Sequence, residues 1–226
     1  PTKFMRILHL ETSSKNCSVA ISEDQKILCS CDEVSENYKQ SESLHTFVQW
    51  ALEGAEIDLS SIDAIALGMG PGSYTGLRIG ASAAKGFCFG LNVPLIAINS
   101  LDSMVEPFIG EDFDLIIPMV DARRMEVYCG IYDAKTGAIL GATEAKILEN
   151  SSFDNFKDKK ILFVGDGAKK AETLLQLPFA KYNSEVYPSA KYLVNKAAEK
   201  FKNKDFEDVA YFEPFYLKDF HGLKKN

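Results

Sequence analysis

The chain has 226 residues, of which 46% are hydrophobic, and its formal net charge is −7. This length can bury the core of one compact domain or of two small lobes. The acidic balance argues against a protein whose main task is to grip nucleic acid with its own surface. Its apolar runs are strand-sized and interrupted by charge, and residues 1–10 contain no apolar stretch of signal-peptide length. We therefore expect a cytoplasmic protein without a membrane span.

The cysteines indicate reduced thiols. There are five, an odd number, and no two of them form a C-x-x-C pair. This favours core or strand positions over a disulfide framework or a zinc knuckle.

The N-terminal half begins with three short apolar segments and then changes to a helical period. Residues 5–10, 17–21 and 26–31 are predicted strands, and residues 22–25 have the composition of a turn. Three strands with tight connections favour an antiparallel meander. The apolar spacing from residue 41 to residue 55 is helical. Further strands are predicted at 62–67 and 93–98, and Ser100 is expected to cap the next helix.

The segment between these last two strands, "GMGPGSYTGLRIGASAAKG" (residues 68–86), joins a buried strand to a helix. Pro71 fixes φ, and the glycines at 70 and 72 can adopt positive φ. Ser73 or Thr75 can cap the helix with its hydroxyl, and free amides at a helix start can also bind an anion. No Gly-Lys-Ser/Thr ending and no G-x-G-x-x-G spacing is present. Capping is therefore favoured, with phosphate binding as the alternative.

The helix that follows, residues 74–91, is apolar on two sides. Such a helix should be buried on both, so one side can cover its own sheet while the other meets a second lobe or another protein. An ordinary core helix and a partner-binding helix both fit this pattern. Trp50 on the preceding helix favours a partner, because tryptophan is enriched at interface hot spots. The two stripes are Leu77, Gly80, Ala81, Ala84, Cys88 and Leu91, and Ile79, Ala83, Phe87 and Gly90.

The C-terminal half repeats the order of elements. A strand is predicted at 115–120, and a hairpin has arms at 125–132 and 138–143 around the turn 133–137. Residues 106–114 are the candidate hinge between the two halves. The pattern predicts an α/β protein of two lobes, each an antiparallel meander followed by parallel strand–helix units. The last predicted elements are a strand at 161–164 and helices at 169–175 and 190–201.

Several segments resemble the TsaB (YeaZ) family. They are "ILHLETSSKNCSVAI", "GPGSYTGLRIG", "AKGFCFGLNVPLIAINSL" and "VDARRMEVYCGIYD", followed by "GDGA" and by "EPFYLKDF" near the end. The last segment is similar to the family's Pro-x-Tyr-Leu-Arg ending, with Lys218 in place of arginine. The resemblance implies a two-lobed, actin-like (ASKHA) fold of the ribonuclease-H-like type. We place its lobes at residues 1–105 and 106–226.

The resemblance also implies a role in making threonylcarbamoyladenosine in tRNA. Proteins of this family are expected to serve as non-catalytic partners of the catalytic homologue TsaD, together with the ATPase TsaE. In the absence of TsaD, two copies are expected to form a homodimer. The tRNA would be reached only indirectly, through the complex. No cofactor is expected in the isolated subunit, and a nucleotide at the joint interface is left open.

The catalytic residues of TsaD are not matched here. TsaD-like proteins carry an H-x-x-x-H metal pair where this chain has Ser100 and Met104. Their first loop reads Glu-Thr-Ser-Cys-Asp-Glu, whereas this chain has Lys15 and Asn16 in place of the last two carboxylates. Most TsaB-like chains have aspartate where this chain has Glu11. The three histidines, His9, His45 and His221, lie far apart in sequence, so no histidine-based metal site is expected.

The alternative function is an independent ATP-dependent phosphotransferase or metallohydrolase, including the older glycoprotease interpretation. Asp121 could bind Mg²⁺, although pairing with Arg123 or Arg124, or capping of a turn, is favoured. A protease would need a nucleophile–base pair or zinc, and no convincing set is present. The candidate degenerate nucleotide site comprises Thr12, Ser13, Gly70, Gly72, Ser73, Thr75, Asp121, Gly165 and Gly167.

The expected partner interface lies on helices 41–55 and 74–91. A third possibility, direct tRNA binding by lysines between residues 157 and 170, is weakened by interleaved acidic residues. The interface residues predicted are Leu44, Phe47, Val48, Trp50, Ala51, Leu77, Ile79, Gly80, Ala83, Ala84 and Phe87.

Overall fold

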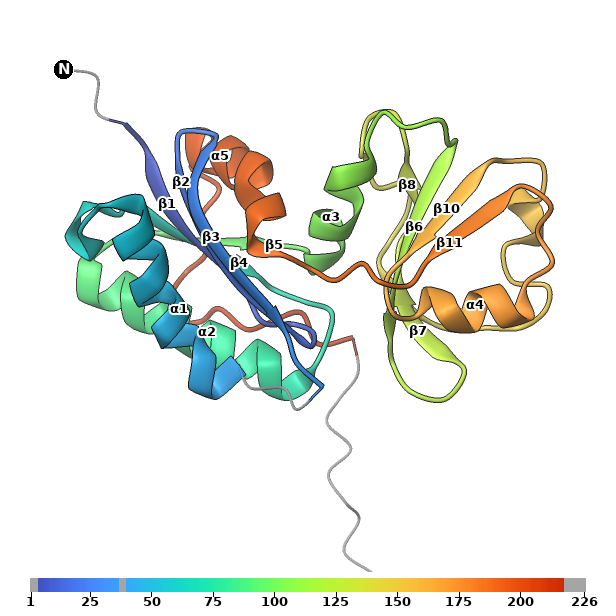
Figure 1. Cartoon of the computed structure of the whole chain (residues 1–226), viewed down its shortest axis with the longest axis horizontal. Helices are drawn as coiled ribbons and strands as arrows, with labels where there is room; N and C mark the ends of the chain where they lie inside the picture. The colour runs from blue at the N-terminus through green and yellow to red at the C-terminus, as the bar shows by residue number, and fades with distance from the viewer. Residues whose placement is uncertain (1–3, 37–39, 218–226) are drawn as a thin grey trace, which may run out of the picture.

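The computed structural model describes residues 4–36 and 40–217, which form two lobes, each built around one β-sheet (Figure 1). The first sheet has the strand order β3-β2-β1-β4-β5, and the second has the order β11-β10-β6-β7-β9, with β8 paired to β6. This confirms the two-lobed α/β architecture. Lys218 and His221 lie outside the described residues.

The first sheet combines a meander with parallel strands, as the apolar pattern predicts. Strands β1 to β3 are antiparallel neighbours, whereas β4 and β5 run parallel to β1. Residues of β1 and β4 are buried on both faces of the sheet, so both faces must be covered by helices. The strands are β1 (Arg6–Glu11), β2 (Asn16–Glu23), β3 (Lys26–Val34), β4 (Ala64–Gly68) and β5 (Leu95–Ile98).

Helices cover the two faces of this sheet. On one face, α1 (Gln40–Ala55) and α2 (Tyr74–Leu91) share a core with Leu8 and Leu10 of β1. On the other face, α5 (Val194–Lys202) packs with Ile7 of the same strand. Because side chains alternate along a strand, β1 contributes to both cores. The first lobe also contains the short 3-10 helices η1 (Leu59–Ser61) and η4 (Ala190–Leu193).

The second sheet has the same plan, with shorter strands. Strands β6, β7 and β9 are antiparallel, and β10 and β11 run parallel to β6. Helix α4 (Ala168–Leu174) lies between β10 and β11 in the sequence. The other elements are β6 (Leu115–Asp121), β7 (Glu126–Cys129), β8 (Tyr132–Asp133), β9 (Glu144–Ile147), η3 (Asp154–Phe156), β10 (Ile161–Val164) and β11 (Ala180–Asn183).

The predicted hairpin of this lobe is wrong in its arms. The turn is present, because Asp133 Oδ1 accepts hydrogen bonds from the backbone amides of Lys135 and Thr136 at 3.0 and 2.8 Å. The first arm, however, is divided into β7 and β8, which pair with different parts of β6. The second arm makes one bridge, at Ile139, and then leaves the ladder. Pairing resumes only at β9, beyond Gly141, where a glycine weakens strand structure.

A second correction concerns α3 (Ser100–Val105). Asn99 caps this helix, since its side-chain oxygen accepts a hydrogen bond from the Leu101 amide at 2.9 Å. Ser100 is the first helical residue, and its buried hydroxyl accepts from the Gly70 amide at 3.0 Å. The hydroxyl therefore ties the helix to the turn before α2 instead of capping the helix.

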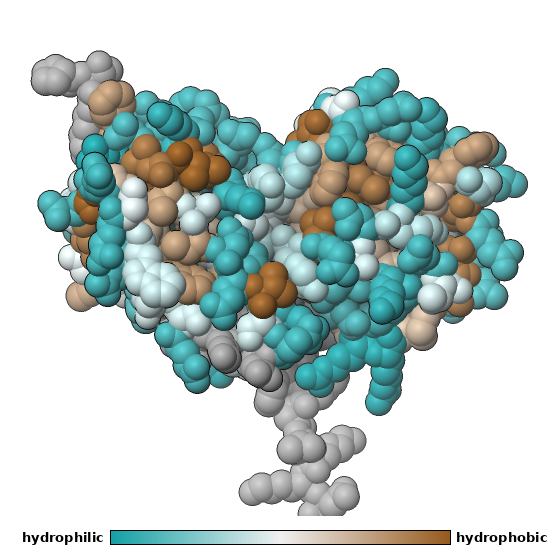
Figure 2. Space-filling model, in the orientation of Figure 1, coloured by the Kyte–Doolittle hydropathy of each residue, from teal (hydrophilic) through white to brown (hydrophobic). Residues whose placement is uncertain are grey.

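Two helices connect the lobes. Helix α3 follows β5 and packs on the second sheet, and η2 (Glu106–Phe108) continues it. Helix α5, which follows the strands of the second sheet, packs on the first. The two helices flank a notch between the lobes at the top of the view (Figure 2). The boundary between the two lobes, placed between residues 105 and 106, stays a prediction.

Hydrogen bonds join the lobes at the chain's second crossing, where it returns to the first sheet. Asn16 Nδ2 donates to Pro188 O at 3.0 Å, Ser189 Oγ donates to Asp32 Oδ1 at 2.7 Å, and the Ala190 amide donates to Ser18 Oγ at 2.8 Å. Within the described ranges, no helix has both the length and the apolar character needed to cross a membrane.

Candidate functional site

The turn before α2 holds the loop after β1 against the helix. Ser73 caps α2 by accepting a hydrogen bond from the Gly76 amide at 3.3 Å, which confirms one of the two predicted caps. The Ser73 amide donates to Ser13 O at 2.7 Å, and Thr12 Oγ1 donates to Gly76 O at 2.7 Å. A Cβ atom at Gly72 would lie 2.1 Å from Ser13 O. The glycines therefore allow two backbone segments to touch, and Thr12 and Ser13 are buried beneath them.

The other members of the predicted nucleotide set on this turn have different environments. Gly70 has a positive φ of 102° and its amide is bonded to the Ser100 hydroxyl. Thr75 is exposed in the first turn of α2. The backbone of Thr12 and Ser13 lies in close contact with Gly76 and Gly72. The nucleotide site stays a prediction, and these contacts weigh against it.

The second-lobe members of the set are also packed against their own sheet. Asp121 Oδ1 accepts hydrogen bonds from Lys170 Nζ at 2.7 Å and from the Arg123 amide at 2.6 Å. The expected turn cap is therefore present, but the side-chain partner is a lysine and not either arginine. Cβ atoms at Gly165 and Gly167 would lie 2.2 and 3.0 Å from atoms of Met119.

Lys15 of the first loop lies near enough to Asp166, a neighbour of Gly165 and Gly167, to affect its ionisation. Burial raises the pKa of Asp166, the hydrogen bond from the Asp121 amide opposes this shift, the Asp121 charge adds to it, and the Lys15 charge lowers the pKa. Among residues 4–36 and 40–217, no group of three or more histidine, cysteine or acidic side chains could hold a metal ion. At the two positions of the TsaD histidine pair, Ser100 and Met104 are both buried.

Two ionisable side chains of β1 are fully buried. Burial lowers the pKa of His9 to about 3, and its Nε2 lies 2.8 Å from Ser22 Oγ. Burial raises the pKa of Glu11, although its Oε1 accepts a hydrogen bond from the Ser13 amide at 2.8 Å. Glu11 Oε2 has no hydrogen-bond partner in the described part of the chain. His9 is thus a buried core residue whose Nδ1 has no hydrogen-bond partner in the described part of the chain, and Glu11 lies beneath the first loop without access to solvent.

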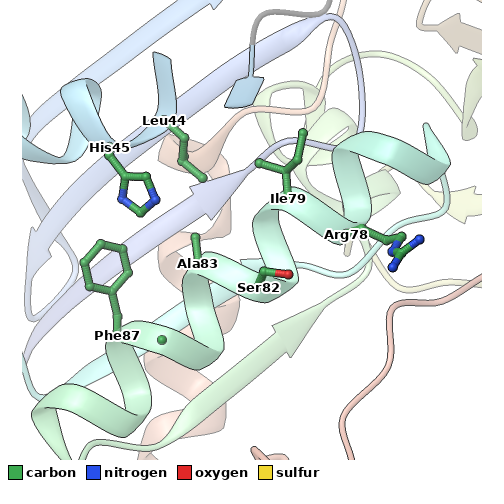
Figure 3. Close-up of a pocket in the computed structure, with 8 residues that line it drawn as sticks. Leu44, His45, Arg78, Ile79, Ser82, Ala83 and Phe87 are labelled. Atoms are coloured by element: carbon green, nitrogen blue, oxygen red, sulfur yellow. The ribbon is translucent and has the colours of Figure 1, made fainter. Parts of the chain in front are cut away.

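A groove between α1 and α2 lies within the predicted interface (Figure 3). It has a volume of about 620 Å³, and its lining is mainly apolar. Ile79, Ala83 and Phe87 project from α2 toward α1, where the His45 ring lies 5.8 Å from the Phe87 ring (Figure 3). The complete lining is Leu44, His45, Arg78, Ile79, Ser82, Ala83, Gly86 and Phe87.

The predicted interface set divides into two groups. One group packs on the first sheet and is buried within the lobe: Leu44, Phe47, Val48, Ala51, Leu77, Gly80 and Ala84. The other group is at least partly accessible: Trp50, Ile79, Ala83 and Phe87. Trp50 is 53% exposed and stacks on Phe47 at 5.5 Å between ring centroids. Whether these residues bind a partner stays a prediction, but only the second group offers surface.

Sequence reasoning missed several residues of the groove. Arg78, Ser82 and His45 line the groove but are not among the predicted interface residues, and neither is Gly86. Its Cβ would meet no atom within 4 Å. The apolar period of each helix alone could not reveal the groove, because it forms where two helices meet.

Comparisons with known proteins show which proteins this chain resembles in sequence and fold. The sequence model of a family described as "TsaD: tRNA N6-adenosine threonylcarbamoyltransferase" matches residues 35–222. The chain is 30% identical to a tRNA threonylcarbamoyladenosine biosynthesis protein TsaB from Bacillus subtilis, over 71% of both chains. It is 27% identical to the Escherichia coli protein of that name, over 98% of both. A solved structure, YeaZ from Pseudomonas aeruginosa, is 28% identical, with a TM-score of 0.83 over 94% of this chain and 100% of that one.

Proposed function

This chain belongs to the TsaB (YeaZ) family, and from that premise we propose that it takes part in the biosynthesis of threonylcarbamoyladenosine in tRNA as a non-catalytic subunit. In this role it binds and supports TsaD, which carries out the transfer to the tRNA adenosine, and works with the ATPase TsaE. The tRNA is held mainly by the complex. The independent phosphotransferase or metallohydrolase is not favoured by any contact of the described residues.

The observation that carries the proposal is the groove between α1 and α2, and Gly86 in particular. A glycine inside a helix costs about 1 kcal/mol relative to alanine. Gly76 and Gly80 are needed within the chain, because a Cβ at either would lie 2.1 to 2.3 Å from Thr12. Gly86 is exposed and has no such contact. The close approach of a partner helix would explain it, and the same surface could join two copies when TsaD is absent.

Pairing with TsaD is tested by changing Ala83, which is half-buried and lines the groove. We expect Ala83→Glu to abolish co-purification with TsaD, because the substitution places an unpaired charge in an apolar contact. The thermal unfolding temperature should stay close to that of the unchanged chain. Ala84 is unsuitable for this test, since it is fully buried and a charge there would unfold the monomer.

A matched control uses Ser60, an exposed residue of η1 that lies outside the groove. Ser60→Glu adds the same charge to the same lobe and should leave pairing intact. Retention of TsaD by Ala83→Glu, or equal loss in both variants, would remove the groove from the interface.

A further inference from the structure

The tip of the hairpin between β6 and β7 contains two arginines with an unfavourable backbone. Arg123 and Arg124 have φ values of 73° and 50°, in the left-handed region that residues with a Cβ rarely adopt. Two such residues in succession are usually asparagine or glycine. Backbone of this kind persists where the surrounding structure holds it, and it is concentrated at binding sites. The arginines at this tip therefore need an explanation beyond turn formation.

Hydrogen bonds hold the tip in place from both sides. The Glu126 amide donates to Arg123 O and the Ala122 amide donates to Glu126 O, both at 3.1 Å. From α4, Lys170 Nζ donates to Glu126 O at 3.1 Å and to Asp121 Oδ1 at 2.7 Å. The Asp121 carboxylate also accepts from the Arg123 amide. The backbone that presents the two side chains is thus rigid, although the hairpin projects from the second lobe (Figure 1).

Neither guanidinium group forms an ion pair within the described part of the chain, and the one electrostatic effect of Arg123 there is to oppose the rise that burial causes in the pKa of Tyr128. Both side chains are exposed, and neither has an ion pair or a side-chain hydrogen bond among residues 4–36 and 40–217. The sequence has only two other arginines, and both have partners. Arg6 is paired with Glu23 at 2.9 Å, and Arg78 lies over the Tyr74 ring at 5.5 Å.

We propose that Arg123 and Arg124 contact the phosphate backbone of the RNA on which the proposed complex acts. Planar guanidinium groups bind phosphate oxygens in a bidentate manner and are weakly hydrated, so they suit this task better than lysine. The inference rests on the proposed function, which supplies the RNA. It refines the expectation of indirect contact, because the chain itself then contributes a small part of the RNA-binding surface.

The acidic balance of the chain limits where RNA can touch it. With a net charge of −7, most of the surface repels phosphate, and a partner must supply the remaining basic area. Two lysines of the same lobe, Lys160 and Lys146, are paired with Asp112 and Glu144. The other exposed lysines of this lobe lack the planar, bidentate guanidinium group that the two arginines at the tip present.

The test measures binding of the full chain to a labelled anticodon stem–loop RNA at several low salt concentrations. We expect the double variant Arg123→Gln/Arg124→Gln to bind at least about tenfold more weakly. Each lost phosphate contact should reduce the slope of log K against log salt by about 0.9, so the slope should fall by roughly two. The control Lys157→Gln/Lys159→Gln removes the same charge from two exposed residues of the same lobe and should change affinity less than about twofold.

Two further measurements separate bidentate phosphate binding from the effect of charge alone, and RNA binding from pairing with TsaD. Arg123→Lys/Arg124→Lys keeps the charge but loses the bidentate geometry, and should give an intermediate affinity. Pairing of each variant with TsaD is followed separately and should not change, so a failure here differs from a failure of the proposed function. Absence of RNA binding by the unchanged chain, equal losses in both glutamine variants, or loss of TsaD pairing by the arginine variant would overturn the inference.

Discussion

At the residue scale, Glu11 shows how strongly position determines chemistry. The carboxyl group belongs to the last residue of β1 and is fully buried. A Cβ at Gly68 would lie 1.8 Å from its Oε2, so Gly68 gives the carboxyl the space that it occupies. With burial as the leading cause of its raised pKa, the group is more stable as the neutral acid than it would be in water.

We expect Glu11→Gln to stabilise the chain at neutral pH but not in acid. At low pH, Glu11 is protonated in both the folded and the unfolded state, so its ionisation does not lower the free energy of unfolding. As pH rises above the ordinary glutamate pKa, the unfolded state loses its proton first, and the free energy of unfolding falls until the raised folded pKa is reached. Each unit of pKa difference is worth about 1.4 kcal/mol. Gln removes this loss while keeping an oxygen for the Ser13 amide.

Denaturant unfolding of the two chains between about pH 4 and pH 8 measures this difference. The gap in the free energy of unfolding should widen as pH rises. A constant gap, or a destabilised variant at pH 8, would mean that Glu11 is ionised in the folded state and stabilised by its surroundings.

Single residues also mark the limit of sequence reasoning. Ala83 and Ala84 are neighbours in an apolar helix, and both were assigned to the interface. Only the structure separates them, since Ala84 is fully buried and Ala83 borders the groove. The cap of α2, by contrast, is narrowed to Ser73 or Thr75 by position alone, because capping depends on the next few residues, and the structure selects Ser73.

At the scale of elements, α2 joins two tasks along one helix. Its N-terminal turns pack against the first loop through glycines, and its later turns border the groove with α1. Residues 74–91 were predicted as a helix with two apolar stripes, and the helix has these bounds. Most of the first stripe is buried in the core, and half-buried residues of the second line the groove.

Two glycine substitutions in α2 should have opposite effects. Gly80→Ala should destabilise the chain by about 1 to 3 kcal/mol, because the new Cβ would lie 2.3 Å from Thr12 Oγ1. Gly86→Ala should stabilise the isolated chain by up to about 1 kcal/mol, because its Cβ meets open space and alanine favours the helix. Thermal and denaturant unfolding of the two variants provides the comparison.

Binding of TsaD by the Gly86→Ala variant is the second measurement of this experiment. If a partner helix approaches closely at Gly86, the alanine variant should bind TsaD more weakly although it folds more stably. Equal or tighter binding would indicate that the partner does not fill this part of the groove.

Elements with weak or absent periodicity were the ones misjudged. Strand β11 was not predicted, and β7, β8 and β9 were drawn with the wrong limits. These strands have two to four residues, too few for an alternating pattern to define register. Strands β7 and β8 pair with different parts of β6, whereas β9 pairs with β7 and β11 pairs with β10.

At the scale of the whole molecule, the loops of the predicted nucleotide site pack against other parts of the chain. Residues 12–14 lie under α2, and Gly165 and Gly167 pack on Met119. We therefore expect isothermal titration with ATP and Mg²⁺ to give no measurable binding by the isolated chain. Micromolar binding with turnover would favour the phosphotransferase alternative. A positive control with TsaE, an ATPase, would establish that the titration detects binding.

The biological role is tested by depleting the protein in cells. Mass spectrometry of tRNA nucleosides should show loss of threonylcarbamoyladenosine, and expression of the unchanged chain should restore it. The Ala83→Glu variant should fail to restore it if pairing with TsaD is required. An unchanged level after depletion would contradict the proposed function.

The sequence by itself determined the features that depend on local order: the helical stripes, the buried strands, a cap for α2 at Ser73 or Thr75, and the family segments around residues 7–132. Their causes lie within a few residues, in side-chain period, glycine and proline geometry, and capping. It also indicated two lobes, because the order of elements repeats.

Only the tertiary structure decided which apolar residues remain accessible, where α3 and α5 pack, and that the first loop is closed against α2. It also brought Lys170 of α4 to Asp121 at the base of the β6–β7 hairpin. The physical reason is that burial and hydrogen bonding depend on contacts between residues far apart in the chain. A single sequence records the chemistry of each residue but not which distant residue will meet it.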